Sequence, residues 1–162
     1  MINAKGVVAF GWVVAIGLAL TLEAPVKTVV AQGVSPVGSW YGSADGTALG
    51  IPHVYMMPTF FQDGTLIAND IIDKTHTTAH GAWQRVGARG IKATFVWINL
   101  SLTDPPGTPA GTALVVLEGT IDAHDQNRME GKVTARFCDM DVANCSPAVD
   151  APFESLRRIQ VQ

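Results

Sequence analysis

The chain has 162 residues, of which 48% are hydrophobic and 15% charged, and its formal net charge at pH 7 is −3. This length suits one domain with a sizeable core, and the lack of a basic run argues against nucleic acid and anionic lipid surfaces as partners. No glycine-rich phosphate loop or dinucleotide motif is present, so no cofactor is expected.

Residues 1–31 are expected to be a signal peptide that is not part of the fold. Lys5 supplies a positive charge near the start, and the stretch from Gly6 to Leu22 is apolar and uncharged. Val29 and Ala31 fit the small-residue rule for cleavage, so we place the cut after Ala31. The alternative is an uncleaved membrane anchor, but the apolar stretch is slightly shorter than the roughly 20 residues that a bilayer requires. Either interpretation places the domain in the periplasm or outside the cell, and cleavage would leave no stable membrane span.

Residues 32–162 have the pattern of a single domain built from short β-strands. Gly, Pro, Asp and Asn separate the apolar runs, and no long window keeps a helical period. In chain order the expected strands are 37–43, 52–61, 65–71, 79–86, 91–100, 112–122, 129–138 and 153–161. Asp63-Gly64 suits a tight hairpin, and the proline-rich segment before the sixth strand is a loop because proline donates no ladder hydrogen bond. Hairpin after hairpin predicts an up-and-down meander.

The last strands show one apolar face. In the seventh expected strand, Val133, Ala135 and Phe137 alternate with polar residues. In the eighth, one face carries Phe153, Ser155, Arg157, Ile159 and Val161, and the opposite face is polar except for Leu156. A sheet with one apolar face must bury it, and no helix is expected that could cover it. Closing the sheet on itself buries that face and also removes the exposed edges. We therefore predict an all-β fold, an eight-stranded up-and-down antiparallel β-barrel.

The first expected strand carries Gly38, Trp40 and Tyr41 in a G-x-W-Y pattern. This pattern resembles the first-strand motif of lipocalins and of the wider calycin group. Residues 32–162 are also similar to small secreted lipocalin-like proteins of bacteria, with "FFQDGTL" followed by "HGAW". The resemblance implies a barrel floor in which Trp40 packs against an arginine of the last strand. Arg157 lies on the apolar face of that strand, and a guanidinium over an indole ring is a favourable cation–π arrangement.

A barrel of about eight strands can hold one small ligand or fill itself with side chains. The candidate lining consists of aromatic residues and one methionine, whose side chain adapts to irregular apolar shapes: Tyr55, Met57, Phe61, Trp83, Phe95 and Trp97. Arg85 shares a face with Trp83, and Asn99 shares one with Trp97, so these two residues are expected to supply polar contacts near a mouth. We therefore expect a small apolar molecule to bind in the lumen.

Two other functions stay open at this point, as does the oligomeric state. One is a barrel isomerase or cyclase that resembles allene oxide cyclase, and the other is an interaction module with a filled core. We expect a binding protein rather than an enzyme, because no catalytic signature is present. If the protein is an enzyme, His80 is the best general acid or base.

Cys138 and Cys145 are the only cysteines. An oxidising compartment favours a disulfide between them, worth roughly 2–3 kcal/mol, and the alternative is two free thiols. No metal is expected: no histidine lies near the cysteines, and His76 and His80 in one strand would lie roughly 13 Å apart. We expect His76 to lie at the surface and His80 to be packed or hydrogen-bonded beside Gly81.

Overall fold

Nearly all the regular structure is β-strand in the described residues, 33–70, 76–103 and 105–160 of the computed structural model. The strands are β1 Gly38–Asp45, β2 His53–Phe60, β3 Thr65–Asp70, β4 Ala79–Val86, β5 Gly90–Leu100, β6 Pro109–Ile121, β7 Arg128–Cys138 and β8 Val149–Arg158. One 3-10 turn, η1 Thr47–Leu49, follows β1. The expected signal peptide, residues 1–31, lies outside the described residues. Among the described residues, no helix has the length and apolar character that crossing a bilayer would require.

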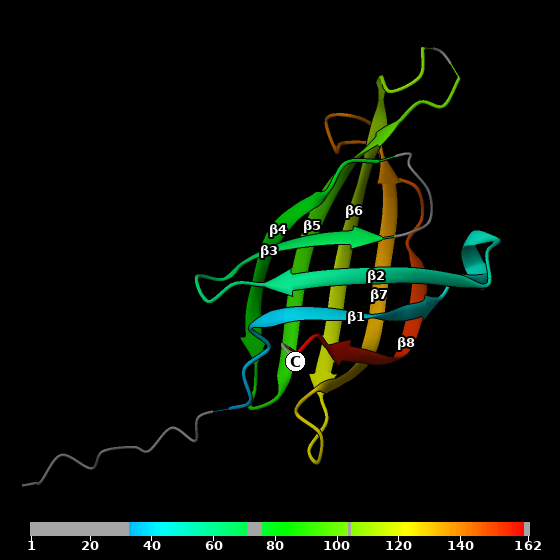
Figure 1. Cartoon of the computed structure of the whole chain (residues 1–162). Helices are drawn as coiled ribbons and strands as arrows, with labels where there is room; N and C mark the ends of the chain where they lie inside the picture. The colour runs from blue at the N-terminus through cyan, green and yellow to red at the C-terminus, as the bar shows by residue number, and fades with distance from the viewer. Residues whose placement is uncertain (1–32, 71–75, 104, 161–162) are drawn as a thin grey trace, which may run out of the picture. The chain divides into compact units, whose positions relative to one another are not determined.

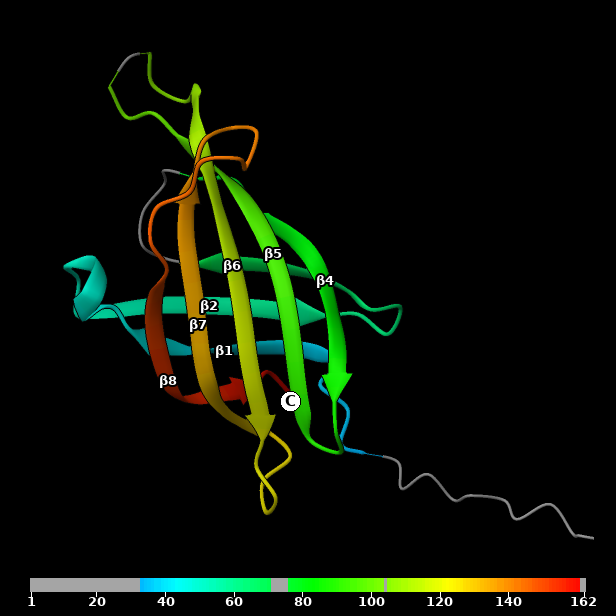
Figure 2. The same ribbon diagram turned by 180° about the vertical axis from the view of Figure 1, so that it is seen from behind.

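The strands form a closed antiparallel barrel in the order of the sequence, β1 to β8. Strands β1 to β3 pass across β5 to β7 (Figure 1), and the view from behind shows the same crossing (Figure 2). The barrel closes where β1 pairs with β8, with Trp40 opposite Arg158 and Gly42 opposite Leu156. The predicted up-and-down barrel and its eight strands are confirmed, and the largest difference in a strand boundary is at β8, which begins at Val149.

Glycine permits the close approach of strands at this seam. A Cβ atom added at Gly42 would lie 2.4 Å from the backbone oxygen of Ser155 and 2.8 Å from the Leu156 side chain. Both distances are shorter than real Cβ contacts, so a larger residue would push β8 away from β1. The small residue in the first strand therefore helps the sheet to close.

One end of the barrel is filled by large side chains. The fully buried ones at this closed end are Trp40, Phe60, Leu66, Ile121, Met129 and Leu156. The indole Nε1 of Trp40 donates a hydrogen bond to the backbone oxygen of Pro36 at 2.7 Å. These six side chains fill this end of the barrel.

The guanidinium over Trp40 belongs to Arg158 and not to Arg157. The Cζ atom of Arg158 lies 4.6 Å from the centre of the Trp40 ring. Its nitrogens donate to the backbone oxygens of Val37 and Ser35, both at 2.6 Å. Burial lowers the pKa of Arg158, which stays a cation because arginine titrates so high.

The prediction that Arg157 closes the floor is wrong because of a β-bulge. Between the pairs Gly131–Phe153 and Met129–Leu156, β7 advances by two residues and β8 by three. The extra residue reverses the alternation in β8. Arg157 therefore points outward, where it contacts the carboxylate of Asp125 at 2.6 Å.

Candidate ligand cavity

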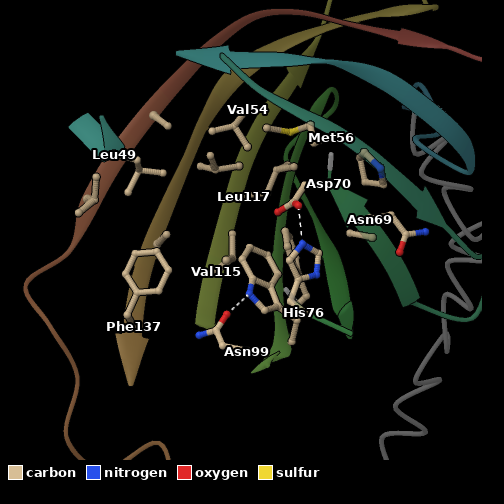
Figure 3. A pocket seen from close by; sticks show the side chains of 18 of the residues that line it. Leu49, Val54, Met56, Asn69, Asp70, His76, Asn99, Val115, Leu117 and Phe137 are labelled. Carbon is tan, nitrogen blue, oxygen red and sulfur yellow. Dashed lines mark hydrogen bonds and ion pairs between the residues drawn. The ribbon is translucent and has the colours of Figure 1, made fainter. Parts of the chain in front are cut away.

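A cavity of about 360 Å³ occupies the other end of the barrel. Its walls are mostly apolar, and the inward-facing residues that form them are Val54, Met56, Pro58, Ala68, Phe95, Val115, Leu117, Val133, Ala135 and Ala151. Leu49, Ile51, Phe137 and Val149 also line it, and all four are at least partly exposed. Figure 3 shows these side chains converging from several strands. This volume is at the lower end of the range for small-molecule sites. It equals the liquid volume of about a dozen waters, so the cavity suits a ligand of about a dozen non-hydrogen atoms.

One wall of the cavity is polar. Asp70 is the last residue of β3, and its carboxylate Oδ1 lies 2.5 Å from Nε2 of His76. The imidazole of His76 lies against the indole of Trp97, with ring centroids 5.1 Å apart. The Trp97 Nε1 in turn donates to Oδ1 of Asn99 at 2.9 Å. Figure 3 shows this polar wall, with Asp70, His76 and Asn99 labelled.

Backbone contacts with β5 hold His76 in place. His76 forms an isolated antiparallel bridge with Asn99. The next residue, Thr77, donates its N–H to the backbone oxygen of Ile98 at 3.0 Å and accepts the Ile98 N–H at its hydroxyl, at 3.1 Å. Strand β4 begins only at Ala79. The imidazole is therefore positioned by β5, and the alternation of β4 does not extend to it.

The hydrogen bonds of His76 define the charge of its pair with Asp70. Nδ1 of His76 lies 2.8 Å from the backbone oxygen of Thr77, and a carbonyl only accepts, so Nδ1 carries a hydrogen. Nε2 faces Oδ1 of Asp70, so one further proton lies between these two atoms. Whether this proton sits on the ring or on the carboxyl, the net charge of the pair is zero. The side chains are 11% and 5% exposed, and a neutral pair costs far less to bury than a lone charge.

Three of the predicted lining residues do line the cavity: Phe95, Trp97 and Asn99, all on β5. The prediction failed for β2. Tyr55, Met57 and Phe61 are exposed, while Met56 and Phe60 point inward. Large side chains occupy both faces of β2, so hydrophobicity alone does not tell its faces apart. The pairing with β1 decides which face of β2 points inward. Met56 lies opposite Gly42, and Tyr55 stacks on Tyr41 outside the barrel.

Trp83 and Arg85 are not among the residues that line the cavity. The Trp83 indole packs edge-on against Phe60 with centroids 5.9 Å apart, and its Nε1 donates to the backbone oxygen of Phe61 at 2.9 Å. Arg85 donates to the backbone oxygen of Val34 at 2.9 Å. The structure thus places Trp83 at the closed end of the barrel and Arg85 against the segment that leads into β1.

The two histidines exchange their expected places. His80 is exposed and is not among the residues that line the cavity. His76, expected at the surface, is the one in the cavity wall. The sequence carried one usable signal for this wall, because Asp70 shares the alternation of Leu66 and Ala68, which are buried. It carried no signal for His76, which lies outside a regular strand.

The predicted disulfide between Cys138 and Cys145 is present. It joins the end of β7 to the segment that leads into β8. The same segment is held to Phe137 by a backbone hydrogen bond from Ser146 at 2.7 Å. The cross-link therefore stiffens the part of the mouth that Phe137 and Val149 form.

Comparisons with protein-family models, curated proteins and solved structures find no match for the chain. Within the described ranges, no group of three or more His, Cys, Asp or Glu side chains is placed to hold a metal ion. The candidate site therefore depends on the geometry of the cavity and on the chemistry of its polar wall.

Proposed function

We propose that the protein is a secreted or periplasmic lipocalin-like barrel that binds a small, largely apolar molecule in its lumen. The observation that carries this proposal is the 360 Å³ cavity, whose walls are mostly apolar and which lies beyond a densely filled floor. The G-x-W-Y motif and the contact between Trp40 and Arg158 of the last strand support the lipocalin-like assignment. The disulfide supports export, because oxidising compartments favour such bonds.

The cavity supports binding over a filled-core module and sets a size limit that can be measured. Each buried methylene contributes about 0.8 kcal/mol, or about fourfold in Kd. A series of straight-chain primary alcohols should therefore gain about fourfold per carbon until the cavity is full. We expect this gain to stop near ten carbons, where the molecule has about a dozen non-hydrogen atoms.

Isothermal titration calorimetry of alcohols with six to fourteen carbons tests the proposal. The expected result is one site per chain, a negative heat-capacity change and an affinity that levels off near ten carbons. Absence of binding throughout the series would contradict the proposal. So would an affinity that keeps rising by the same factor up to fourteen carbons, because that is the behaviour of partition onto an apolar surface.

A second candidate is an isomerase or cyclase that acts on an apolar substrate. The pairing of Asp70 with His76 favours it, because a carboxyl and an imidazole that share a proton can exchange protons with a bound molecule. Turnover by the wild-type protein that disappears in Asp70→Asn, with binding retained, would support it. Recovery of every bound compound unchanged after incubation, as judged by mass spectrometry, would count against it.

A further inference from the structure

We propose that the side-chain amide of Asn99 recognises the ligand by donating a hydrogen bond to it. The ligand is then an apolar molecule with a hydrogen-bond-accepting oxygen at one end, as in a ketone, an aldehyde or an ester. This inference rests on the proposed function and adds the chemical class of the ligand to it.

The orientation of the Asn99 amide follows from its contact with Trp97. The indole Nε1 of Trp97 lies 2.9 Å from Oδ1 of Asn99, and an indole N–H can only donate, so the amide oxygen must face it. The NH2 group therefore takes the other prong of the amide. Figure 3 shows this hydrogen bond at the Asn99 oxygen and the amide nitrogen on the side of Phe137. The atom of Asn99 that is left for a ligand is a donor.

The neighbours of Asn99 leave this donor uncovered. In the part of the chain that the structure describes, the amide nitrogen has no hydrogen-bond partner. Across the sheet Asn99 pairs with Gly111 of β6, which has no side chain, and its bridge to His76 is made by the backbone. Asn99 is half-buried in the cavity lining. A ligand that covers the amide without offering an acceptor would leave the donor unsatisfied, which costs more than a hydrogen bond gains.

The place of Asn99 in β5 puts the ligand oxygen at one end of the molecule. Asn99 is the last residue but one of this strand, and the inward residues that precede it are Trp97 and Phe95, at intervals of about 7 Å. Phe95 pairs with Val115, which pairs with Ala135, so this row across the cavity is apolar. A ligand that fills the cavity with an apolar chain therefore brings its outer end to Asn99. An oxygen in the middle of that chain would lie among apolar side chains.

Two ketones of the same composition test the inference: 2-decanone, with its carbonyl at one end, and 5-decanone, with its carbonyl in the middle. The two isomers lose nearly the same hydration on binding, so a difference in Kd reports where the donor lies. In calorimetry with the wild-type protein, we expect 2-decanone to bind about tenfold more tightly, because a buried carbonyl without a partner costs about that much.

The other outcomes separate the inference from the proposed function. Equal affinities for the two ketones would overturn the inference and leave the proposed function standing. The same holds if 1-decanol binds and neither ketone does. If none of the three compounds binds, the proposed function fails together with the inference.

Substitutions then assign the preference to Asn99. Asn99→Leu has nearly the same shape, keeps the backbone bridge to His76 and lacks the donor, so the preference for 2-decanone over 5-decanone should fall at least about fivefold. Asn127→Leu is the matched control: Asn127 is also half-buried, but it lies between β6 and β7 and not in the lining, so its preference should equal that of the wild type. An unchanged preference in Asn99→Leu would show that hydration of the carbonyl at the mouth causes it, and would overturn the inference.

A measurement on the wild-type protein covers the case in which Asn99→Leu does not fold. Proton–nitrogen NMR resolves the side-chain NH2 groups of asparagines. We expect one proton of the Asn99 NH2 group to shift downfield as 2-decanone saturates the site, because a hydrogen bond to the carbonyl deshields it. An Asn99 NH2 signal that stays in place at saturation would overturn the inference.

Discussion

The two ends of this barrel have the same backbone architecture and differ in the size of the side chains that point inward. At the closed end, Trp40, Phe60 and Met129 fill the interior and are fully buried. At the open end, much of the inner wall is small, with Ala68, Ala135 and Ala151 among its residues, and a cavity of about 360 Å³ remains. The comparison teaches that strand number sets the width of the barrel, while inward side-chain volume sets where a ligand can fit.

Removal of the floor should have the largest effect. Trp40→Ala deletes a fully buried indole, its hydrogen bond to Pro36 and its contact with Arg158, so we expect a loss of about 3–5 kcal/mol in the free energy of unfolding. Trp97→Ala, at the partly exposed cavity wall, should cost clearly less. Urea denaturation followed by circular dichroism measures both. Equal losses would show that the two ends do not differ in packing as described.

The neighbouring arginines of β8 offer a matched pair. Arg158 donates to several backbone oxygens and lies over Trp40, so Arg158→Ala should cost about 2–3 kcal/mol of stability. Arg157 makes an exposed ion pair with Asp125, and Arg157→Ala should change stability by less than about 0.5 kcal/mol. The difference between the two urea midpoints is the measurement. A larger loss of stability in Arg157→Ala than in Arg158→Ala would restore Arg157 as the floor residue and refute the bulge in β8.

Filling the cavity should separate binding from stability. Ala135→Leu adds a larger side chain to the cavity wall, so decanol should bind at least about tenfold more weakly while the barrel stays folded. Arg136→Leu adds an apolar side chain at the next position, which is exposed, and should leave the affinity unchanged. Calorimetry on both variants distinguishes them. Equal affinities for wild type and Ala135→Leu would place the ligand elsewhere.

The smallest expected effect is acid sensitivity of the loop near the mouth. Asp139 accepts hydrogen bonds from the Asn144 side chain and from the backbone N–H of Ala143, and these bonds hold its pKa below the ordinary value of 3.8. A carboxyl whose pKa is lower in the folded state than in the unfolded state stabilises the fold at pH values above its unfolded-state pKa. That stabilisation is lost as the pH falls through its folded-state pKa. Asp139→Asn should therefore lose slightly less stability than the wild type between pH 6 and pH 3. Urea midpoints at the two pH values measure this, and a larger loss in the variant would contradict the assignment.

The fold could be predicted because most strands are amphipathic and turn residues separate the strands. The sequence did not determine which face of β2 is inside, because Tyr55 and Met57 are as apolar as Met56 and Phe60. It pointed to the bulge in β8 only through Leu156, the one residue that broke the alternation. His76 could not be found, since a bridge to β5 and not its own strand places it in the wall. Alternation thus predicts regular strands well, and it fails where an extra residue or a non-local contact sets the side-chain direction.

The central claim is that a small apolar molecule binds at the open end and leaves the closed end unchanged. The indole N–H resonances report on both ends, because Trp97 lines the cavity while Trp40 and Trp83 donate to backbone oxygens at the other end. In a proton–nitrogen NMR titration with 1-decanol, we expect the Trp97 indole signal to shift and saturate at one equivalent while the Trp40 and Trp83 signals stay in place. An unmoved Trp97 signal, or a saturable shift confined to Trp40 and Trp83, would contradict the account.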